Sequence, residues 1–440
     1  MRSSRWKEYD LLVVGAGVLG VSIAYWLSSV YDCSIAVADS AGGVAAHTSS
    51  RNTGVVHRPF YLDPDRKKVF ARSAAVSYPL WRKFSRESML PWVETGTLEA
   101  APTESGIAVL HKYLGWAEKN GMEEAETELL DGREVASLEP EVHCAAALHS
   151  KTDTSVDFGL MTRRLFDHCD RAGVDLLSTS RVERVSTGPT GRCLVSFSPA
   201  ADSSGVSCRF LVNAGGAGAL TLAHKEGLAR DLSALYFRGD YWRVAGGFAK
   251  KVGRNVYTPP RHPAFPFLDP HLVVRADGTR QVGPNAVLVG GPYAYQGFGF
   301  RHAPSSLERP LGPKLRLAMN TEFLSLLAGE WRSSLSKDAM ARRVRKFIPR
   351  LDTSLLEERG LAGVRGSVVS SRGFEPEAIL VFGEESCHVL NYNSPGATGA
   401  PAFSAKVVKD LQSEGRLDGL RKRPRLTESP WSFDEVASSI

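Results

Sequence analysis

The 440-residue chain is 43% hydrophobic and 23% charged, which is typical of a folded globular protein, and its length allows two or three domains. The net charge of +6 is small for this length and does not indicate a nucleic-acid-binding protein, in which basic residues gather on one element. The six cysteines are scattered, without a CxxC pair or a Cys/His cluster, so the sequence predicts a cytoplasmic protein with reduced thiols, no disulfide framework and no metal site.

The N-terminal residues predict one βαβ unit. Residues 9–14 (YDLLVV) are typical of a strand in a parallel sheet covered on both faces, and a helix-compatible stretch, VSIAYWLSSV, follows the loop at residues 15–20. A second apolar strand at residues 34–38 ends at Asp39. The apolar run of residues 11–30 is long enough to cross a membrane, but the glycine spacing inside it favours a buried strand and helix.

The loop between this strand and helix has the GxGxxG spacing of a dinucleotide-binding fold. Gly15 permits a tight turn, Gly17 lets the backbone approach a pyrophosphate, and Gly20 lets the helix pack on the strand. The N-terminus of the helix supplies N–H groups and a positive dipole to the phosphates. Asp39, nineteen residues after Gly20, is placed to accept a hydrogen bond from a ribose hydroxyl. NAD and FAD share this fingerprint, so the loop predicts a dinucleotide of either kind.

The segment HTSSRNTGVVHRP (residues 47–59) is dense in hydroxyl, amide and cationic groups and follows the βαβ unit closely in sequence. Ser50, Arg51 and Asn52 are candidates for hydrogen bonds to phosphate or ribitol oxygens. His57 is a candidate base or hydrogen-bond donor beside a flavin ring. A loop histidine that is bonded within the protein is the alternative interpretation of His57.

The rest of the chain predicts a helix, short strands, a strand-rich region and a helical region. The helix is expected at residues 160–172, and the short strands at 174–177, 181–185, 194–198 and 208–213. Strands are then expected within 235–289, one or two helices in 314–351, a strand pair at 378–382 and 388–392, a helix at 401–411, and a loosely structured tail after residue 416.

Two further glycine clusters favour FAD over NAD. NAGGAG (residues 213–218) follows a predicted strand, and SPGATG (394–399) precedes the last long helix. Three such loops can surround an extended FAD, whereas NAD needs only one. Each later cluster, taken alone, is also compatible with an ordinary tight turn.

These stretches resemble the FAD-dependent oxidoreductases of the D-amino-acid-oxidase and glycerol-3-phosphate-dehydrogenase superfamily, and within it the L-2-hydroxyglutarate dehydrogenase/oxidase group. The most specific stretches are SSRNTGVVH (residues 49–57) and VGPNAVL (282–288). VVGAGVLG (13–20), LVNAGGAGA (211–219) and NSPGATGAPAF (393–403) are general to the superfamily, so the resemblance covers nearly the whole chain.

The resemblance implies a noncovalent FAD, since no cysteine lies in an obvious flavin-linking context. It implies that FAD contacts come from the three glycine loops and neighbouring segments: Gly15, Gly17, Gly20, Asp39, Ser50, Arg51, Asn52, Val182, Ala214, Gly215, Gly363, Gly396, Ala397 and Thr398. His57 matches the histidine that these enzymes place over the flavin, and Tyr241 and His271 lie on the strands expected to roof the substrate site.

The implied reaction is oxidation of a small 2-hydroxy acid to the 2-oxo acid. His57 would take the hydroxyl proton, a hydride would pass to flavin N5, and Arg58, Arg365 or Arg238 would hold the substrate carboxylate. Arg58 departs from the family, which has a small residue after the histidine, so this arginine faces either the substrate or solvent. The electron acceptor would be oxygen, a quinone or a redox protein.

Three alternatives remain. A malate dehydrogenase that reduces quinone would sit peripherally on the inner face of a membrane through the basic runs ARRVRK (residues 341–346) and RKRPR (421–425). An amine or amino-acid oxidase uses the same superfamily fold. A flavin-binding assembly or tRNA-associated factor would bind FAD without turnover.

The expected fold is α/β, with a Rossmann-like FAD-binding domain and a second domain for the substrate. The FAD-binding domain is discontinuous and is assembled from residues 1–95, 150–225 and 355–415. The substrate domain, a largely antiparallel sheet with helices, takes residues 96–149 and 226–354, and residues 416–440 form the tail.

Overall fold

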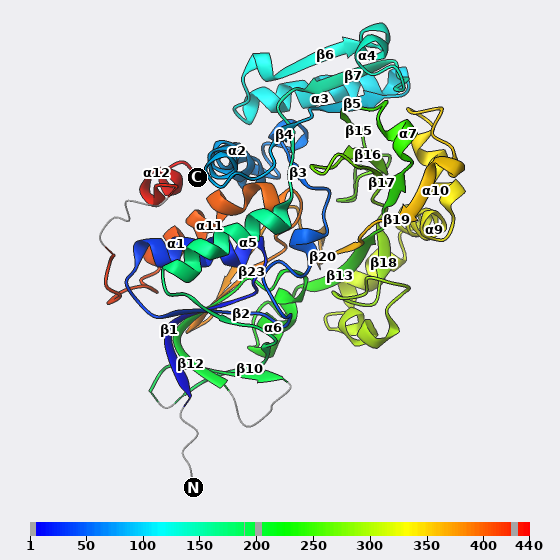
Figure 1. Ribbon diagram of the computed structural model, residues 1–440. Helices are drawn as coiled ribbons and strands as arrows, with labels where there is room; N and C mark the ends of the chain where they lie inside the picture. The colour runs from blue at the N-terminus through cyan, green and yellow to red at the C-terminus, as the bar shows by residue number, and fades with distance from the viewer. Residues whose placement is uncertain (1–5, 189, 199–204, 424–429) are drawn as a thin grey trace.

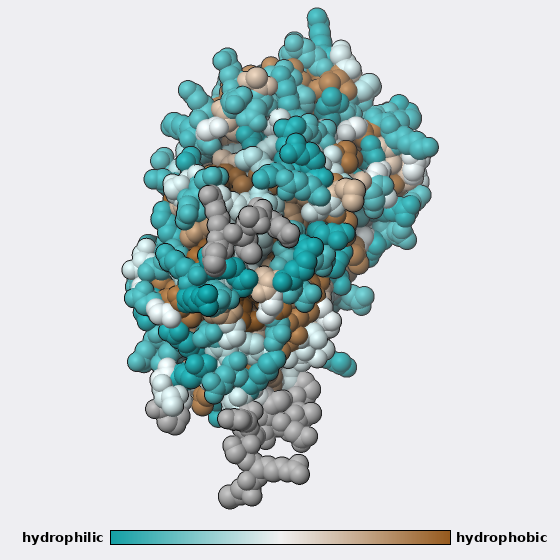
Figure 2. Space-filling model, turned by 60° about the vertical axis from the view of Figure 1, so that its left-hand side comes forward, coloured by the Kyte–Doolittle hydropathy of each residue, from teal (hydrophilic) through white to brown (hydrophobic). Residues whose placement is uncertain are grey.

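The computed structural model describes residues 6–188, 190–198, 205–423 and 430–440 and has a mixed α/β architecture with two regions (Figure 1). One region holds a mainly parallel sheet with helices packed over it, and the other holds mostly antiparallel sheets, which confirms the predicted fold class. The face shown in Figure 2 is mainly hydrophilic, with apolar side chains scattered among polar ones. Among the described residues, no helix is long and apolar enough to cross a lipid bilayer.

The first region is built on an eight-stranded sheet. Its path runs β10-β11-β12-β1-β2-β9, and β23 and then β22 continue from β12. β1 pairs in parallel with β2 and β12, whereas β10 and β11 form an antiparallel pair. The strands are β1 (Lys7–Val14), β2 (Ile35–Ala38), β9 (Asp175–Leu177), β10 (Arg181–Thr187), β11 (Cys193–Ser198), β12 (Gly205–Asn213), β22 (Ile379–Phe382) and β23 (Ser386–Leu390).

Both faces of this sheet are covered. Leu11 and Val13 of β1 belong to the core beneath the helices, and Leu12 belongs to a separate core on the opposite face. This explains the continuous apolar run in the sequence, and it confirms a strand and a helix where a membrane span was the rival. The main helices of the region are α1 (Val18–Val30), α2 (Lys68–Glu87), α5 (Phe158–Arg171), α6 (Ala219–Lys225) and α11 (Gly396–Ser413).

The second region combines an eight-stranded sheet, β19-β14-β17-β16-β15-β5-β7-β6, with a four-stranded one, β18-β13-β20-β21. The strands of the larger sheet are β5 (Thr97–Ala101), β6 (Thr127–Asp131), β7 (Ala146–Ser150), β14 (Trp242–Val244), β15 (Asn255–Tyr257), β16 (His271–Val274), β17 (Arg280–Gly283) and β19 (Leu356–Arg359). The smaller sheet has β13 (Ser233–Gly239), β18 (Val287–Val289), β20 (Gly363–Ser370) and β21 (Gly373–Phe374). The helices are α3 (Glu104–Lys119), α4 (Gly132–Leu138), α7 (Gly246–Ala249), α8 (Gly312–Ala318), α9 (Thr321–Leu335) and α10 (Lys337–Val344).

A three-stranded sheet joins segments that are far apart in sequence. It consists of β3 (Val55–Val56), β8 (Thr154–Ser155) and β4 (Val93–Glu94). The antiparallel register pairs Val56 with Thr154. Because an antiparallel pair runs in opposite directions, His57 after β3 lies opposite Asp153 before β8.

Three local predictions need correction. The last long helix, α11, begins at Gly396 rather than at residue 401, because the glycine cluster forms its first turn. A Cβ on Gly399 would lie 2.9 Å from the Cβ of Ser73 on α2, so the small residues allow this turn to pack closely. Residues 314–351 hold three helices rather than one or two.

The C-terminal tail is the third correction. Residues 430–440 include α12 (Phe433–Ser438) and pack on the first region (Figure 1). Trp431 is buried, its ring centroid lies 5.8 Å from that of Trp26 and 5.6 Å from that of Trp81, and its indole N–H donates to the carbonyl of Leu80. Residues 424–429, which include the end of RKRPR, lie outside the described residues.

The predicted domain boundaries stay a prediction. β19 and β20 come from the segment assigned to the FAD-binding domain, but they pair with β14 and β13 of the second region.

Candidate active site

A cavity lies where the two regions meet, and its lining residues come from many separate parts of the chain, which fall into three groups. The α1 loop and residues 48–57 contribute Gly17, Val18, Leu19, Thr48, Ser49, Arg51, Asn52, Thr53, Val55 and His57. The later glycine clusters contribute Ala214, Gly216, Ala217 and residues 391–398. The second region contributes Phe237, Tyr241, Tyr257, Phe267, His271 and residues 363–366. We call the first two groups the cofactor side and the third group, with His57, the substrate side.

The N-terminus of α1 opens onto the cofactor side. Gly17 is the N-cap residue and has no side chain to cap the helix, and of the first-turn N–H groups that of Val18 donates to Ser49 Oγ at 2.9 Å. Gly15 has φ +106°, and a Cβ there would lie 2.5 Å from the carbonyl oxygen of Ala214. The first and second glycine loops therefore touch, and they leave uncapped helix N–H groups beside the cavity, which suits a pyrophosphate.

Arg51 adds a positive charge to this helix end. Its guanidinium lies 4.5 Å from the ring centroid of Tyr295, and within the described part of the chain its Nε atom is buried without a hydrogen-bond partner. Asn52 lines the cavity too, but its amide donates to the carbonyls of Thr48 and Ser49 and so shapes the loop. An uncapped helix end beside a cation with an unused N–H fits the phosphates of a dinucleotide.

The other predicted cofactor residues divide into two sets. Ala214, Gly363, Gly396, Ala397 and Thr398 line the cavity with Gly17, Arg51 and Asn52, whereas Gly15, Gly20, Asp39, Ser50, Val182 and Gly215 do not. Asp39 instead holds the loops, because its carboxylate accepts from the N–H groups of Ala16 at 2.7 Å and Ala41 at 2.8 Å. Ser50 donates to the carbonyl of His47, and its neighbour Ser49 takes the place at the helix end.

Thr398 connects the cofactor side to the substrate side. Its hydroxyl accepts from the backbone N–H of His57 at 3.1 Å and donates to the carbonyl of Val55 at 3.3 Å. The first turn of α11 therefore fixes the position of β3 and of His57.

The charges around the cavity are of one sign. Arg51 and Arg365 line it, and no Asp or Glu is among the described residues that do so. A cavity with two permanent cations and no carboxylate favours anionic ligands.

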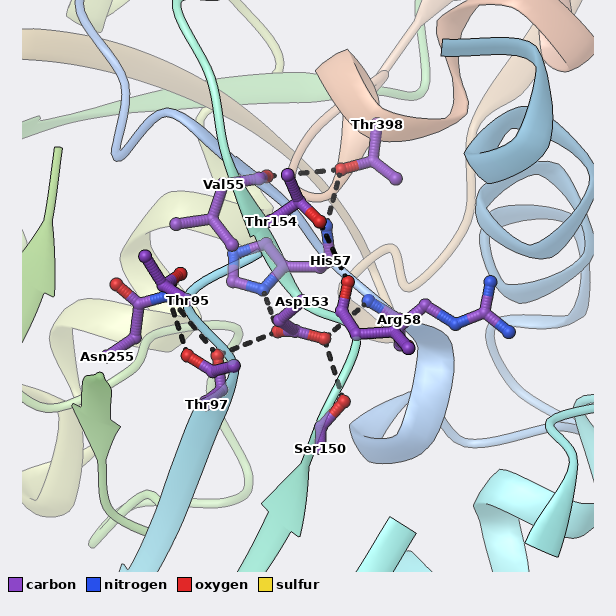
Figure 3. A network of polar contacts seen from close by, with 12 residues as sticks. Val55, His57, Arg58, Thr95, Thr97, Ser150, Asp153, Thr154, Asn255 and Thr398 are labelled. Atoms are coloured by element: carbon purple, nitrogen blue, oxygen red, sulfur yellow. Dashed lines mark hydrogen bonds and ion pairs between the residues drawn. The ribbon is translucent and has the colours of Figure 1, made fainter. Parts of the chain in front are cut away.

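His57 is held by a buried carboxylate (Figure 3). Its Nδ1 lies 3.2 Å from Oδ2 of Asp153, whose side chain is fully buried. The other Asp153 oxygen accepts from the backbone N–H of Arg58 at 2.9 Å and from Ser150 Oγ at 2.8 Å, and Thr97 Oγ1 donates to Oδ2 at 2.9 Å. His57 lines the cavity, so its remaining nitrogen, Nε2, is the one available to a ligand.

A second histidine and two tyrosines complete the substrate side. His271 is the first residue of β16, and its ring stacks on Tyr257 with centroids 3.8 Å apart. Among the described residues, His271 Nε2 and the Tyr257 hydroxyl are buried without hydrogen-bond partners. Burial lowers the pKa of His271 to about 3 and raises that of Tyr257, so both groups are neutral at pH 7. Tyr241 lines the cavity from the link between β13 and β14 rather than from a strand.

Arg365 is the one predicted carboxylate clamp that lines the cavity. Its guanidinium donates to the carbonyl of Pro266 at 2.6 Å, and burial lowers its pKa from the ordinary 12.5. The amino group of Lys67 lies near Arg365. Burial and the charge of Arg365 lower the pKa of Lys67 to about 8.

The structure does not bring Arg58 and Arg238 to the cavity. Arg58 pairs with Glu126 at 2.7 Å and lies 4.5 Å from the ring centroid of Tyr78, so it faces neither substrate nor solvent. Arg238 pairs with Asp240 at 2.7 Å and is buried. A carboxylate ligand would have to displace these partners, which is why both predicted roles are replaced by structural ones.

The sequence did not identify three residues of the site, namely Asp153, Tyr257 and Ser49. Asp153 and Tyr257 lie in KTDTSVD and NVYTPP, which carry no motif, and their importance follows from pairing between distant strands. Ser49 stood within the recognised segment, where the choice between adjacent serines depends on the geometry of one turn.

Comparisons with known proteins agree with this geometry. The family model described as "FAD dependent oxidoreductase" (DAO) matches residues 10–411. The chain is 27% identical to the mitochondrial L-2-hydroxyglutarate dehydrogenase of Caenorhabditis elegans, over 93% of this chain and 94% of that protein. It is 26% identical to the L-2-hydroxyglutarate dehydrogenase of Escherichia coli K12, over 92% of this chain and 93% of that protein.

Solved structures share the fold at lower identity. L-α-glycerophosphate oxidase from Mycoplasma pneumoniae, a structure with FAD bound, aligns with a TM-score of 0.73 and 21% identity over 95% of this chain and 97% of that one. Glycine oxidase from Geobacillus kaustophilus aligns with a TM-score of 0.68 and 16% identity over 97% of this chain and 98% of that one.

Proposed function

Because this chain belongs to the DAO family of FAD-dependent oxidoreductases, we propose that it oxidises a small 2-hydroxy acid similar to L-2-hydroxyglutarate to the 2-oxo acid. The observation that carries the proposal is the cavity itself, where a carboxylate-backed histidine and Arg365 line a space without any described acidic residue. The cation matches a carboxylate, and the histidine matches a hydroxyl that must lose its proton.

The residues divide the work as follows. Arg365 binds the substrate carboxylate, and His57 accepts the hydroxyl proton at Nε2. Tyr241 and His271 close the substrate wall and restrict the orientation of the acid. The residues of the cofactor side would hold FAD, which would supply the hydride acceptor of the reaction. Holding base, substrate and cofactor together removes an entropic barrier that amounts to about 7–11 kcal/mol in well-oriented systems.

The cofactor is proposed to be noncovalent FAD. Its contacts come from Gly17, Ser49, Arg51, Ala214, Ala397 and their neighbours on the cofactor side. None of the described residues that line the cavity is a cysteine. Acid precipitation of the yellow protein should leave FAD in the supernatant, and flavin retained in the pellet would contradict this part of the proposal.

The electron acceptor is oxygen, a quinone or a redox protein, and one surface supports a membrane contact that a quinone would need. Leu311, Leu315 and Met319 follow each other at four-residue spacing along α8 and are 40%, 60% and 76% exposed. Lys314 and Arg316 lie on the same helix, and each donates to a backbone carbonyl, that of Glu308 and that of Ser371, so the surface combines apolar groups with cations that keep hydrogen bonds within the protein.

The predicted basic run ARRVRK (residues 341–346) suits this contact less well. Arg342 and Arg345 pair with Asp338, and Arg343 pairs with Asp269 and Glu330. Flotation with vesicles containing phosphatidylglycerol tests the contact: the protein should bind them, Leu315→Gln should weaken binding, and equal binding by both proteins would exclude α8.

Anaerobic reduction of the bound flavin tests the reaction. L-2-hydroxyglutarate, L-malate, glycerol-3-phosphate, sarcosine and proline are offered separately, and the loss of the visible flavin absorbance is timed. Rapid loss with hydroxyglutarate or malate is the expected result, and it also names the substrate. Loss with sarcosine or proline alone would make the protein an amine oxidase and would overturn the proposal.

A further inference from the structure

The two histidines of the substrate side differ in what holds their Nδ1 atoms. Nδ1 of His57 faces the carboxylate of Asp153 at 3.2 Å, whereas Nδ1 of His271 faces the backbone carbonyl of Asp269 at 2.9 Å. A carbonyl oxygen only accepts, so His271 donates from Nδ1 and its Nε2 carries a lone pair. A proton added to His271 would be buried with no carboxylate bonded to the ring, since the nearby Asp269 carboxylate pairs with Arg261 and Arg343, and burial lowers the pKa of His271 to about 3.

Asp153 is held in one orientation by several hydrogen-bond donors. Three groups donate to it besides His57, namely the N–H of Arg58 and the hydroxyls of Ser150 and Thr97 (Figure 3). These donors come from three separate segments around β3, β5 and β7, so the carboxylate is fixed on several sides. A carboxylate accepts and does not donate, and therefore the proton between Asp153 and His57 resides on Nδ1.

We propose that Asp153 is the positioning residue that makes His57, and not His271, the proton acceptor of the reaction. It holds the tautomer that leaves Nε2 unprotonated, and it balances the positive charge that forms on His57. This role rests on the proposed function and assigns to that reaction a residue outside the cofactor motifs.

The chemical step balances with these groups. The substrate O–H and C2–H bonds break, and the second bond of the C2=O group forms. The proton goes to Nε2 of His57, and the electron pair leaves C2 with the hydride, which FAD takes up. Asp153 neither gains nor loses a proton, as in other histidine–aspartate pairs.

Asp153→Asn is the sharpest test, because the amide keeps the shape and removes the charge. The asparagine N–H can donate to Nδ1 of His57, which moves the ring proton to Nε2 and removes the base. The rate of anaerobic flavin reduction should fall by about 10²–10⁴, while FAD content and the affinity for a non-reacting 2-oxo acid stay within about twofold. Ser150→Ala is the matched control, because Ser150 donates to the oxygen that does not face His57, and it should cost less than about tenfold.

Nitrogen-15 NMR of the histidine rings supplies a readout that does not depend on turnover. The protein should show His57 with its proton on Nδ1, assigned by the loss of the signal in His57→Gln, and Asp153→Asn should show it on Nε2. A proton on Nε2 in the unmodified protein, or a reduction rate within tenfold in Asp153→Asn, would overturn the proposal. If Asp153→Asn does not fold, the ring proton of the unmodified protein decides alone. Failure of every hydroxy acid to reduce the flavin would reject the proposed substrate while the NMR result still judged the role of Asp153.

Discussion

The cofactor side and the substrate side of the cavity are built by different means. The cofactor side is made largely of backbone, with glycines, loop amides and the uncapped end of α1. The substrate side is made of large side chains, with Tyr241, Tyr257 and His271 from the β13–β16 part of the chain meeting His57 and Arg365, which are far from them in sequence. The first kind of site is encoded by short local patterns and serves any dinucleotide. The second kind depends on long-range pairing and determines which substrate reacts.

The largest expected effect separates chemistry from cofactor binding. His57→Ala should lower the rate of anaerobic flavin reduction by about 10²–10⁴, because the proposed proton acceptor is lost. The protein should stay yellow, since the His57 side chain lies on the substrate side. Stopped-flow absorbance measures the rate, and undiminished reduction would remove His57 from the mechanism.

A pH effect on stability should also originate beneath the substrate side. Glu99 on β5 pairs in register with Tyr257, and burial, followed by the charge of Asp153, raises its pKa to about 8. In the folded protein Glu99 stays protonated up to about pH 8, whereas in the unfolded chain it ionises above about pH 4.5. The free energy of unfolding therefore falls as the pH rises from 4.5 toward 8. Glu99→Gln lacks this loss, so its advantage in free energy of unfolding should grow by about 3 kcal/mol from pH 5 to pH 8.

Urea unfolding at the two pH values measures this difference. Glu128→Gln is the control, because hydrogen bonds from Lys151 and His149 lower the pKa of this half-exposed carboxylate from 4.5, so its stabilisation changes only at lower pH and the effect of the substitution should stay nearly constant between pH 5 and pH 8. If the difference in free energy of unfolding between Glu99→Gln and the unmodified protein is the same at both pH values, the raised pKa of Glu99 is contradicted.

Substrate affinity should depend on one arginine of the three first considered. Arg365→Met should lower kcat/KM by about ten- to hundredfold, mainly through KM, because a charged hydrogen bond of about 1.5–3 kcal/mol is lost. Arg58→Lys is the comparison, and it should leave KM within about twofold because Arg58 faces Glu126. Steady-state kinetics with the acid that reduces the flavin most rapidly decide, and the reverse pattern would restore Arg58 as the clamp.

The smallest effect should be on the affinity for FAD, because many backbone contacts of the cofactor side contribute to binding it. Arg51→Met should weaken FAD binding by about tenfold, since one charged contact among several is removed. Arg184→Met, on the exposed part of β10, should leave it unchanged. Equilibrium dialysis of FAD against apo-protein measures both, and an effect of Arg51→Met on the reduction rate alone would move Arg51 to the substrate side.

The sequence predicted the elements that carry the first glycine loop of the cofactor side, while the FAD contacts of its residues stay a prediction. GxGxxG predicted β1, α1 and β2 correctly, because a tight turn and close helix packing need glycine at fixed positions. The errors arose where packing against distant residues determines the local structure. The helix α11 starts in its glycine cluster because Gly399 fits against Ser73. The C-terminal residues 430–440 pack on the first region through Trp431.

The substrate side was predicted only in part. His57, Tyr241, His271 and Arg365 were found through resemblance to a family, and the structure brings them to one cavity. Asp153 could not be found, because only the register of β3 with β8 places it beside His57. Arg58 misled because adjacency in sequence says nothing about which way a side chain points from a strand end.

The hydroxyl of Thr398 couples the binding of the cofactor to the positioning of His57. It belongs to the turn of α11 that borders the cofactor side, and it holds the backbone of His57. A flavin that rigidifies this turn therefore also stiffens the segment carrying the base, so apo-protein should lose alignment of the base before it loses its fold. In an organism short of flavin, the molecules without the cofactor would then also be the less rigid ones, and proteases would degrade them first.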